Sequence, residues 1–348
     1  MLPTHLPSPR VIDPTSVPSL RWGIIGPGGI ASAFADAAHA HSTQRIVAVA
    51  SLTPGKGEAF ATPRGIEHVF DSYEALVENP DVDVVYVATP HEFHLPQALL
   101  AIAAGKHVLI EKPCALTRAD VEVIAKAASD AKVLAMEAMW TYYLPQTDII
   151  RQILADGILG ETMLVQTDFG QDLRSVPRLN ATTSGGALLD LGIYNFAFTS
   201  LVLGTASTVT TTGALTATGV DDTSSTFFEF SGSGRAIANV SMSSYTPTAA
   251  SIAGSAGLLT IDTPFFTPTG LTLFDPTFNP TAAARWVDES GIFAHEGLSY
   301  EATAFASYVA QGLTDSPLRP MHAVADDIGL IESARHQIGA YLLGEKRP

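Results

Sequence analysis

The sequence predicts an α/β protein with two domains. The first is a Rossmann doubly wound parallel sheet, and the second is an α+β domain with an open-faced, mostly antiparallel sheet. Three observations support this. Apolar runs alternate with helix-length segments from Leu20 to Trp140, and a glycine turn follows the first run. From Thr162 onward, runs rich in Thr, Val and Ser follow one another without helix-length gaps.

The length and composition set the domain plan. A chain of 348 residues exceeds the usual size of one hydrophobic core, and 46% apolar against 16% charged residues is typical of a globular protein. We expect an extended, proline-rich arm at 1–19, a dinucleotide-binding domain at 20–140 and a substrate-binding and dimerisation domain at 141–348. The final helix of the second domain could pack back onto the first domain.

The elements of the first domain follow in order. Short apolar runs bounded by turn residues predict strands, and segments with helical spacing predict helices. Right-handed crossovers would bring the carboxyl ends of these parallel strands to one edge, where ligands bind. The expected strands are 20–25, 45–52, 82–88, 107–110 and 132–138, and the expected helices are 30–41, 56–62, 73–78, 94–104, 118–129 and a linking helix at 144–155.

The second half predicts one sheet with an exposed face and helices on the other face. Turn signals such as Ser231-Gly232-Ser233-Gly234 separate its strands. The expected strands are 162–169, 207–218, 224–231, 235–244, 250–256 and 258–262, and the expected covering helices are 186–203, 300–311 and 321–343.

Charge and hydropathy exclude several classes of function. A net charge of -16 argues against a nucleic-acid partner, because phosphate binding needs clustered Lys and Arg. No uninterrupted apolar run of 18 residues and no secretory signal is present, so we expect a cytoplasmic protein without a membrane partner. Cys114 is the single cysteine, which excludes an internal disulfide, and a structural role is favoured over that of a nucleophile.

A glycine turn predicts the dinucleotide site. Gly26-Pro27-Gly28-Gly29-Ile30-Ala31 matches G-x-G-x-x-A between a strand and a helix. Gly26 permits the tight turn, and Gly28 with Gly29 lets the backbone approach a pyrophosphate. Ala31 lets the helix pack closely on the strand, and the helix N-terminus at Ile30 supplies N–H donors.

The end of the second strand favours NADP over NAD. NAD proteins usually carry an acid there for the ribose 2′-hydroxyl, but no carboxylate appears before Glu58. Ser51 could donate a hydrogen bond to a 2′-phosphate, and Lys56 could add a positive charge. That Lys56 is a solvated loop residue is an equally open interpretation.

Two further strand ends carry polar residues. Thr89, Pro90 and His94 follow the third strand and are expected over the cofactor, although His94 could instead cap its own helix. Glu111 and Lys112 follow the fourth strand. The Lys112 ammonium is expected beside the substrate oxygen, with Glu111 orienting it near the cofactor.

A second cluster lies at 185–195, where a glycine turn opens an apolar helix. Asp190 and Tyr194 are four residues apart and share a helix face. Tyr194 is a candidate proton donor and Asp190 its orienting group, and a purely structural Tyr–Asp hydrogen bond is the alternative.

Three other side chains are candidates for lining the substrate pocket: Trp140, Phe169 and Arg178. Aromatic walls would suit a sugar ring or a cyclic diol. No cluster of ligand residues in the sequence indicates a metal site.

Together the glycine turn, the T-P-x-x-x-H loop, E-K-P and G-G-x-L-x-D-x-G-x-Y resemble the Gfo/Idh/MocA oxidoreductase family in order and spacing. Met136-Glu137-Ala138-Met139-Trp140 and Tyr194 are similar to its branch of dimeric dihydrodiol dehydrogenases and NADP-dependent D-xylose dehydrogenases. The chain departs from the pattern at Leu52, where NADP-preferring relatives often have arginine.

The resemblance implies hydride transfer between nicotinamide and a secondary alcohol or carbonyl carbon of a sugar, polyol or cyclic diol. Lys112, Tyr194 and an assisting Asp190 would be catalytic, and the Lys112–Pro113 bond would be cis. A homo-oligomer, either a dimer or a dimer of dimers, is expected. An NAD(P)-sensing regulatory protein and a sugar–sugar oxidoreductase with tightly bound NADP remain alternatives.

Overall fold

The computed structural model describes residues 2–277 and 279–347 and divides the chain into two compact units. The unit called here the Rossmann unit comprises Val11–Tyr143 and Ile292–Ala325, and the sheet unit comprises the other described residues. Among the described residues, no helix is long and apolar enough to cross a membrane.

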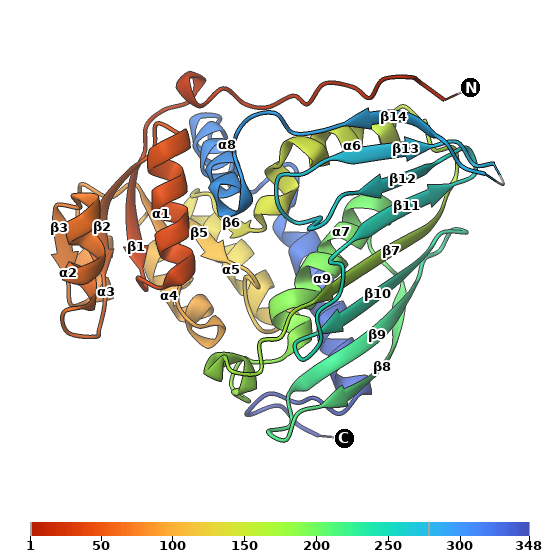
Figure 1. The fold of residues 1–348 in the computed structure, drawn as a ribbon. Helices are drawn as coiled ribbons and strands as arrows, with labels where there is room; N and C mark the ends of the chain where they lie inside the picture. The colour runs from red at the N-terminus through yellow and green to blue at the C-terminus, as the bar shows by residue number, and fades with distance from the viewer. Residues whose placement is uncertain (1, 278, 348) are drawn as a thin grey trace. The chain divides into compact units, whose positions relative to one another are not determined.

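The Rossmann unit contains the predicted parallel sheet (Figure 1). Its strand order is β3-β2-β1-β4-β5-β6, and the order reverses beside β1, which is where dinucleotides bind in this fold. The strands are β1 (Arg21–Ile25), β2 (Arg45–Ala50), β3 (His68–Phe70), β4 (Val84–Val87), β5 (His107–Glu111) and β6 (Ala135–Ala138). The short strand β3 was not predicted, because three residues show no clear period.

Helices cover this sheet on two faces. α4 packs with α3 and α5, while α1 packs with α8, and right-handed crossovers place these groups on opposite faces. The helices are α1 (Gly29–His41), α2 (Lys56–Ala61), α3 (Tyr73–Glu78), α4 (His94–Ala103), α5 (Arg118–Ala131) and α8 (Leu298–Ala310).

The position of α8 corrects one expectation. The segment 300–311 was expected to cover the antiparallel sheet, but α8 belongs to the Rossmann unit. Its Phe305 ring lies 5.1 Å from Trp22 of β1, which also contacts Phe34 of α1 at 5.3 Å. The apolar spacing of a helix shows which of its faces is buried, but not which sheet buries it.

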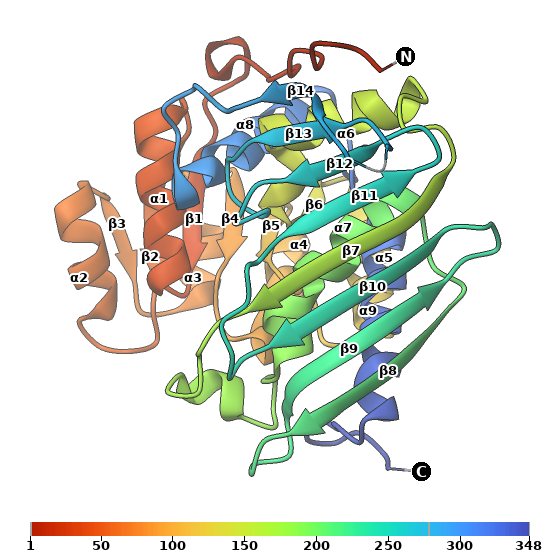
Figure 2. The ribbon, with the colours of Figure 1, turned by 45° about the vertical axis from the view of Figure 1, so that its right-hand side comes forward.

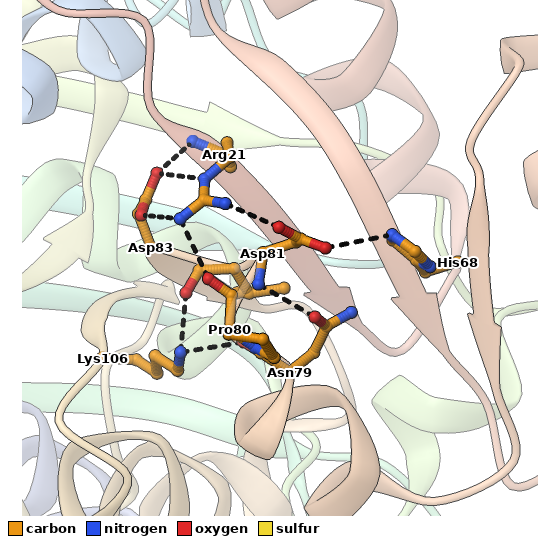
Figure 3. A network of polar contacts seen from close by, with 8 residues as sticks. Arg21, His68, Asn79, Pro80, Asp81, Asp83 and Lys106 are labelled. Atoms are coloured by element: carbon orange, nitrogen blue, oxygen red, sulfur yellow. Dashed lines mark hydrogen bonds and ion pairs between the residues drawn. The ribbon is translucent and has the colours of Figure 1, made fainter.

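A polar network closes the amino-terminal edge of the parallel sheet (Figure 3). The Arg21 guanidinium lies 2.8 Å from Asp83 and 2.9 Å from Asp81, and Lys106 donates to the carbonyl oxygen of Val82 at 2.7 Å. Burial acts to raise the pKa of Asp83, but the hydrogen bonds and charge of Arg21 outweigh it and hold that pKa below its usual range. The charges at this edge are therefore paired with one another, and the opposite edge carries the predicted ligand-binding residues.

The sheet unit contains the predicted open-faced sheet (Figure 2). All neighbouring strands are antiparallel except β7 and β10, which run parallel at the centre. In the order β14-β13-β12-β11-β7-β10-β9-β8 the strands are β14 (Ala282–Trp286), β13 (Leu271–Phe274), β12 (Leu258–Ile261), β11 (Ala250–Gly254), β7 (Thr162–Gly170), β10 (Arg235–Ser241), β9 (Asp221–Glu229) and β8 (Thr208–Leu215). The edge strand β14 and its neighbour β13 were not predicted.

One face of this sheet packs on α7 (Ile193–Leu203), and the other is polar. Outward positions of β7, β9 and β10 are linked by hydrogen bonds, such as Asn239 to Asp168 at 2.8 Å and Ser225 to Asn239 at 2.7 Å. In Figure 2 no helix of the described part of the unit covers this outer face. This alternation explains the Thr- and Ser-rich strand pattern.

Helix α6 (Pro145–Ala155), the part of α9 (Met321–Gln337) from Asp326 onward and residues 2–10 of the arm complete the sheet unit. α6 begins as predicted, whereas α9 ends earlier than the predicted Leu343. Gly339 adopts a φ of +82° just after α9, which is typical of a helix terminus. The N-terminal arm is fixed to α6, because Arg10 pairs with Asp148 at 2.9 Å.

We predict that Phe305→Ala lowers the free energy of unfolding by about 3–5 kcal/mol, because the fully buried ring contacts Trp22 in the core of the Rossmann unit. Urea-induced unfolding measures the change. The matched control is Phe293→Ala, whose ring is 67% exposed and whose loss is expected to cost less than about 0.5 kcal/mol. Equal small losses for both variants would show that α8 does not pack as described.

Candidate active site

The glycine turn forms a cradle at the start of α1. Gly26 has a φ of +86°, and a Cβ there would lie 2.5 Å from the Thr89 side chain. A Cβ at Gly28 would come no nearer than 4.0 Å to another atom, and one at Gly29 would project into open space. The first turn of α1 carries no acidic residue and no side-chain cap. The backbone therefore fits the pyrophosphate of a dinucleotide, whose charge the helix N-terminus would favour.

The end of β2 carries the residues predicted to select the cofactor. The Ser51 hydroxyl accepts from the Thr53 N–H at 3.2 Å and is nearly buried, while Lys56 opens α2 and is exposed. The neighbouring strand β3 ends at Phe70, whose carbonyl accepts from the Ser51 N–H at 3.0 Å. Asp71 follows Phe70, so a carboxylate stands at this edge that the linear sequence did not associate with Ser51.

His94 links two of the predicted loops. Its ring is fully buried, with Nδ1 lying 2.9 Å from the Pro113 carbonyl oxygen and Nε2 lying 3.0 Å from the Thr89 carbonyl oxygen. Burial lowers the pKa of His94, which favours the neutral ring. Thr89 also donates to Gln97 of α4 at 2.5 Å. His94 thus ties the loop after β4 to the loop that carries Lys112.

Glu111 fixes the peptide group of Lys112. One carboxylate oxygen accepts from the Lys112 N–H at 3.1 Å, and the other accepts from the Tyr86 hydroxyl. Burial raises the pKa of Glu111 to about 7, although the hydrogen bond from Tyr86 and the charge of Lys112 act in the opposite direction. The Lys112–Pro113 bond is cis, as the family resemblance implied.

Glu137 of β6 supplies a contact that the sequence did not predict. It accepts from the Cys114 N–H at 3.0 Å and from the Arg319 guanidinium at 2.7 Å. Both side chains of this ion pair are buried. A buried carboxylate and guanidinium stabilise each other only with close, directed hydrogen bonds of this kind. Three successive residues, Lys112, Pro113 and Cys114, are therefore held by buried side chains from β5, α4 and β6.

Cys114 has a structural environment. Its side chain is fully buried, and burial raises the pKa of the thiol well above its usual range. A buried thiol of raised pKa is a poor nucleophile, which agrees with the structural role expected from the sequence.

Glu301 of α8 is a second unpredicted carboxyl group near this loop. It is fully buried, and neither oxygen has a hydrogen-bond partner among the described residues. Burial raises the pKa of Glu301 well above its usual range, and the charges of Glu111 and Glu137 raise it further. These effects favour the protonated, neutral form of Glu301.

Trp140, a predicted substrate residue, stacks on His295 of the Rossmann unit. The ring centroids lie 5.7 Å apart with an angle of 18° between the planes, and Trp140 is only 2% exposed. Burial lowers the pKa of His295, and the charge of Lys112 lowers it further, so Lys112 is within electrostatic range of His295.

In the sheet unit, Asp190 lies on the π-helical turn Leu188–Gly192 that precedes α7. Its buried carboxylate forms a two-bond ion pair with Arg178, at 2.9 and 3.3 Å. Arg178, predicted to line the pocket, is half exposed, and its guanidinium neutralises the charge of Asp190. The sequence predicts a pocket-lining role for Arg178 and an orienting role for Asp190, and the ion pair joins the two residues.

Tyr194 opens α7 within an aromatic cluster. Its ring centroid lies 5.5 Å from Phe169 and 5.2 Å from Phe266, and those two rings stack at 4.7 Å. Phe169 was predicted to lie near the substrate, whereas Phe266 was missed because its segment shows no regular period. The described residues contain no group of three His, Cys, Asp or Glu side chains that could hold a metal ion.

These features define a class: an enzyme with an NAD-binding Rossmann fold that oxidises or reduces CH–OH groups. The model of an oxidoreductase family with an NAD-binding Rossmann fold matches residues 20–139, and that of the GFO/IDH/MocA C-terminal domain matches residues 148–260. The chain belongs to the Gfo/Idh/MocA family of NAD(P)-dependent oxidoreductases.

Named relatives agree with this membership. Trans-1,2-dihydrobenzene-1,2-diol dehydrogenase of Mus musculus is 34% identical, covering 94% of this chain and 100% of its own, and the Homo sapiens protein is 33% identical with the same coverage. A 3-ketoreductase from Actinomadura kijaniata, solved with NADP and TDP-benzene, has a TM-score of 0.79 at 25% identity and covers 92% of this chain and 98% of its own. A levoglucosan dehydrogenase, with a TM-score of 0.81 at 21% identity, covers the same shares and shares the fold.

We predict that Glu301→Gln makes stability less sensitive to alkaline pH. Because the folded-state pKa of Glu301 lies above its unfolded value, the native protein binds this proton more tightly, and stability falls as pH rises above about 4.5. Glutamine removes this loss, which amounts to up to about 1.4 kcal/mol per pH unit until the folded-state pKa is reached.

Thermal unfolding between pH 5 and pH 8 measures this effect, with the exposed Glu67→Gln as the control. The gap in Tm between Glu301→Gln and wild type should widen toward pH 8, and the control should run parallel to wild type. A constant gap would mean that Glu301 is ionised in the native protein.

Proposed function

We propose that this protein transfers a hydride between NADP and a secondary carbinol carbon of a cyclic vicinal diol or a sugar ring. The protein class and the nicotinamide cofactor follow from family membership. The substrate is inferred from the residues around Tyr194 and from the diol dehydrogenase name of the relatives that cover the chain. When bound, the nicotinamide supplies or accepts the hydride.

Lys112 and Tyr194 take the central roles. In the oxidative direction the deprotonated Tyr194 oxygen accepts the hydroxyl proton of the substrate and becomes a phenol, and in the reductive direction the phenol returns that proton. The Lys112 ammonium stabilises the negative charge that develops on the same substrate oxygen. The buried contacts of Glu111, His94 and Glu137 fix the backbone of Lys112, so little reorganisation accompanies the step.

Asp190 and Arg178 support Tyr194. The ion pair neutralises a buried carboxylate one helical turn before Tyr194 and fixes the loop that carries Arg178. We assign Asp190 to orienting the helix that presents Tyr194.

The aromatic cluster carries the proposal about substrate. The Tyr194 ring contacts Phe169 and Phe266, so the proton-transferring hydroxyl stands beside a flat apolar wall. Such a wall favours a ring with an apolar face over an open-chain polyol, because burying that face against aromatic carbons is favourable. Trp140, also predicted to line the pocket, is buried against His295 and is not assigned to this wall.

The preference for NADP rests on the end of β2. Ser51 can donate a hydrogen bond to a 2′-phosphate, and Lys56 offers a positive charge. Asp71 at the end of β3 acts against this preference, so discrimination between NADPH and NADH should be moderate and should increase in Asp71→Asn.

We further infer a homodimer, with the outer face of the sheet as its interface. This face is wide, and Phe227 of β9 is 50% exposed on it. Its Ser, Thr and Asn side chains would supply hydrogen bonds to a second copy.

The proposed function is tested with wild type, Lys112→Ala and Tyr194→Phe on trans-1,2-cyclohexanediol, pentoses, hexoses and inositols, each with NADP and NAD. Turnover of a cyclic substrate should be highest with NADP and should fall by about 10²–10⁴-fold in either variant. Lys126→Ala and the 80% exposed Tyr245→Phe are the matched controls, which should keep wild-type turnover.

Turnover near the wild-type value in Tyr194→Phe would refute the proton-transfer role. Binding of NADPH without turnover of any substrate would favour the regulatory alternative. Purified protein that carries NADP and exchanges hydride only between two sugars would favour the sugar–sugar oxidoreductase.

A further inference from the structure

The helix that carries Tyr194 begins at a pair of glycines with no room for side chains. A Cβ on Gly185 would lie 2.4 Å from the Leu179 carbonyl oxygen, and a Cβ on Gly186 would lie 2.0 Å from Oδ1 of Asp221. Gly186 also has a φ of +112°, which disfavours any side chain. The turn is therefore held between the Leu179 loop on one side and Asp221 of β9 on the other.

Asp221 binds the first N–H groups of the helical segment. Its Oδ2 accepts from the Leu188 N–H at 2.5 Å, and the carboxyl group is 1% exposed. Burial raises the pKa of Asp221 to about 6, while the Leu188 N–H and the charge of Arg335 act in the opposite direction. The group is thus ionised at neutral pH and stabilised by the unsatisfied N–H groups of a helix start.

The segment fixed in this way is short and leads directly to the reactive groups. Asp190 lies two residues after Leu188, and Tyr194 lies six residues after it. Leu188 and Asp190 are part of the π-helical turn Leu188–Gly192, which precedes Tyr194, and such turns are wider and less regular than an α-helix. The position of the Tyr194 hydroxyl consequently depends on where the first turn is fixed.

We propose that Asp221 is a positioning residue, which fixes the start of the Leu188–Leu203 segment and thereby sets the place of the Tyr194 hydroxyl for proton transfer. This inference rests on the proposed role of Tyr194. Asp221 reaches the helix from β9, more than 25 residues later in the chain, so the sheet itself provides the reference point.

The test uses Asp221→Ala and Asp221→Asn in the full chain, with Asp222→Asn as the control, because Asp222 points to the other side of β9. A displacement of about 1 Å can cost about 10²-fold in rate, so we expect that loss of kcat in Asp221→Ala. Asp221→Asn keeps an acceptor oxygen and the side-chain volume, and it should recover about tenfold of that loss. NADPH affinity, measured by fluorescence titration, should stay within about twofold of wild type because the glycine cradle is in the Rossmann unit.

A double-mutant cycle separates positioning from general destabilisation. In a Tyr194→Phe background, Asp221→Ala should lower the remaining kcat by less than about twofold, because the group that it positions is gone. Equal losses in both backgrounds, or unchanged kcat in both Asp221 variants, would overturn the inference. If Tyr194→Phe itself keeps full turnover, the proposed function fails, and that outcome is distinct from normal kcat in Asp221→Ala alone.

Discussion

The fixed backbone at the end of β5 is the constraint on which the active site depends. Glu111 accepts from the Lys112 N–H, His94 lies against the Pro113 carbonyl, and Glu137 accepts from the Cys114 N–H. Each of these side chains is nearly or fully buried, so water does not compete for the contacts. Lysine is a flexible residue, and an ammonium group can act on one defined oxygen only if its own backbone stays in place. Tyr86 connects these contacts to the aromatic core of the same unit, because its ring stacks on Phe34 at 4.2 Å and its hydroxyl donates to Glu111.

In the sheet unit, different groups fix the backbone beside the residue assigned to proton transfer. There the reactive side chain is at the start of a helix rather than at the end of a strand, and the glycine pair lets Asp221 approach the first N–H groups. Arg178 neutralises Asp190 in the same segment. In the Rossmann unit one buried carboxylate, Glu137, accepts from a backbone N–H and from a guanidinium, whereas in the sheet unit Asp221 accepts from the backbone and Asp190 pairs with the guanidinium. In both units these contacts immobilise the backbone beside a residue assigned to catalysis.

The sequence predicts the features that depend on local pattern. The glycine turn, the alternation of strands and helices and the strand end at Glu111-Lys112 are contiguous, so period and motif reveal them. The contacts that fix these residues join distant positions: Glu137 with Arg319, Gly186 with Asp221, and Ser51 with the strand before Asp71. No local pattern encodes such pairs. The sequence shows Glu137 only as part of the motif at 136–140, and it does not indicate the contact with Arg319. The segment 300–311 was assigned to the wrong sheet for the same reason. The spacing of apolar residues identifies a helix and its buried face, but it does not identify the sheet against which that face packs.

Amide hydrogen exchange of the segment 107–116 measures whether buried side chains immobilise the peptide groups beside Lys112. We expect the Lys112 and Cys114 amides to exchange about as slowly as those of Val108–Ile110 within β5, because they donate to Glu111 and Glu137. Exchange as rapid as that of the exposed turn at Ala217 and Thr218 would show that the loop that carries Lys112 opens freely in the native protein.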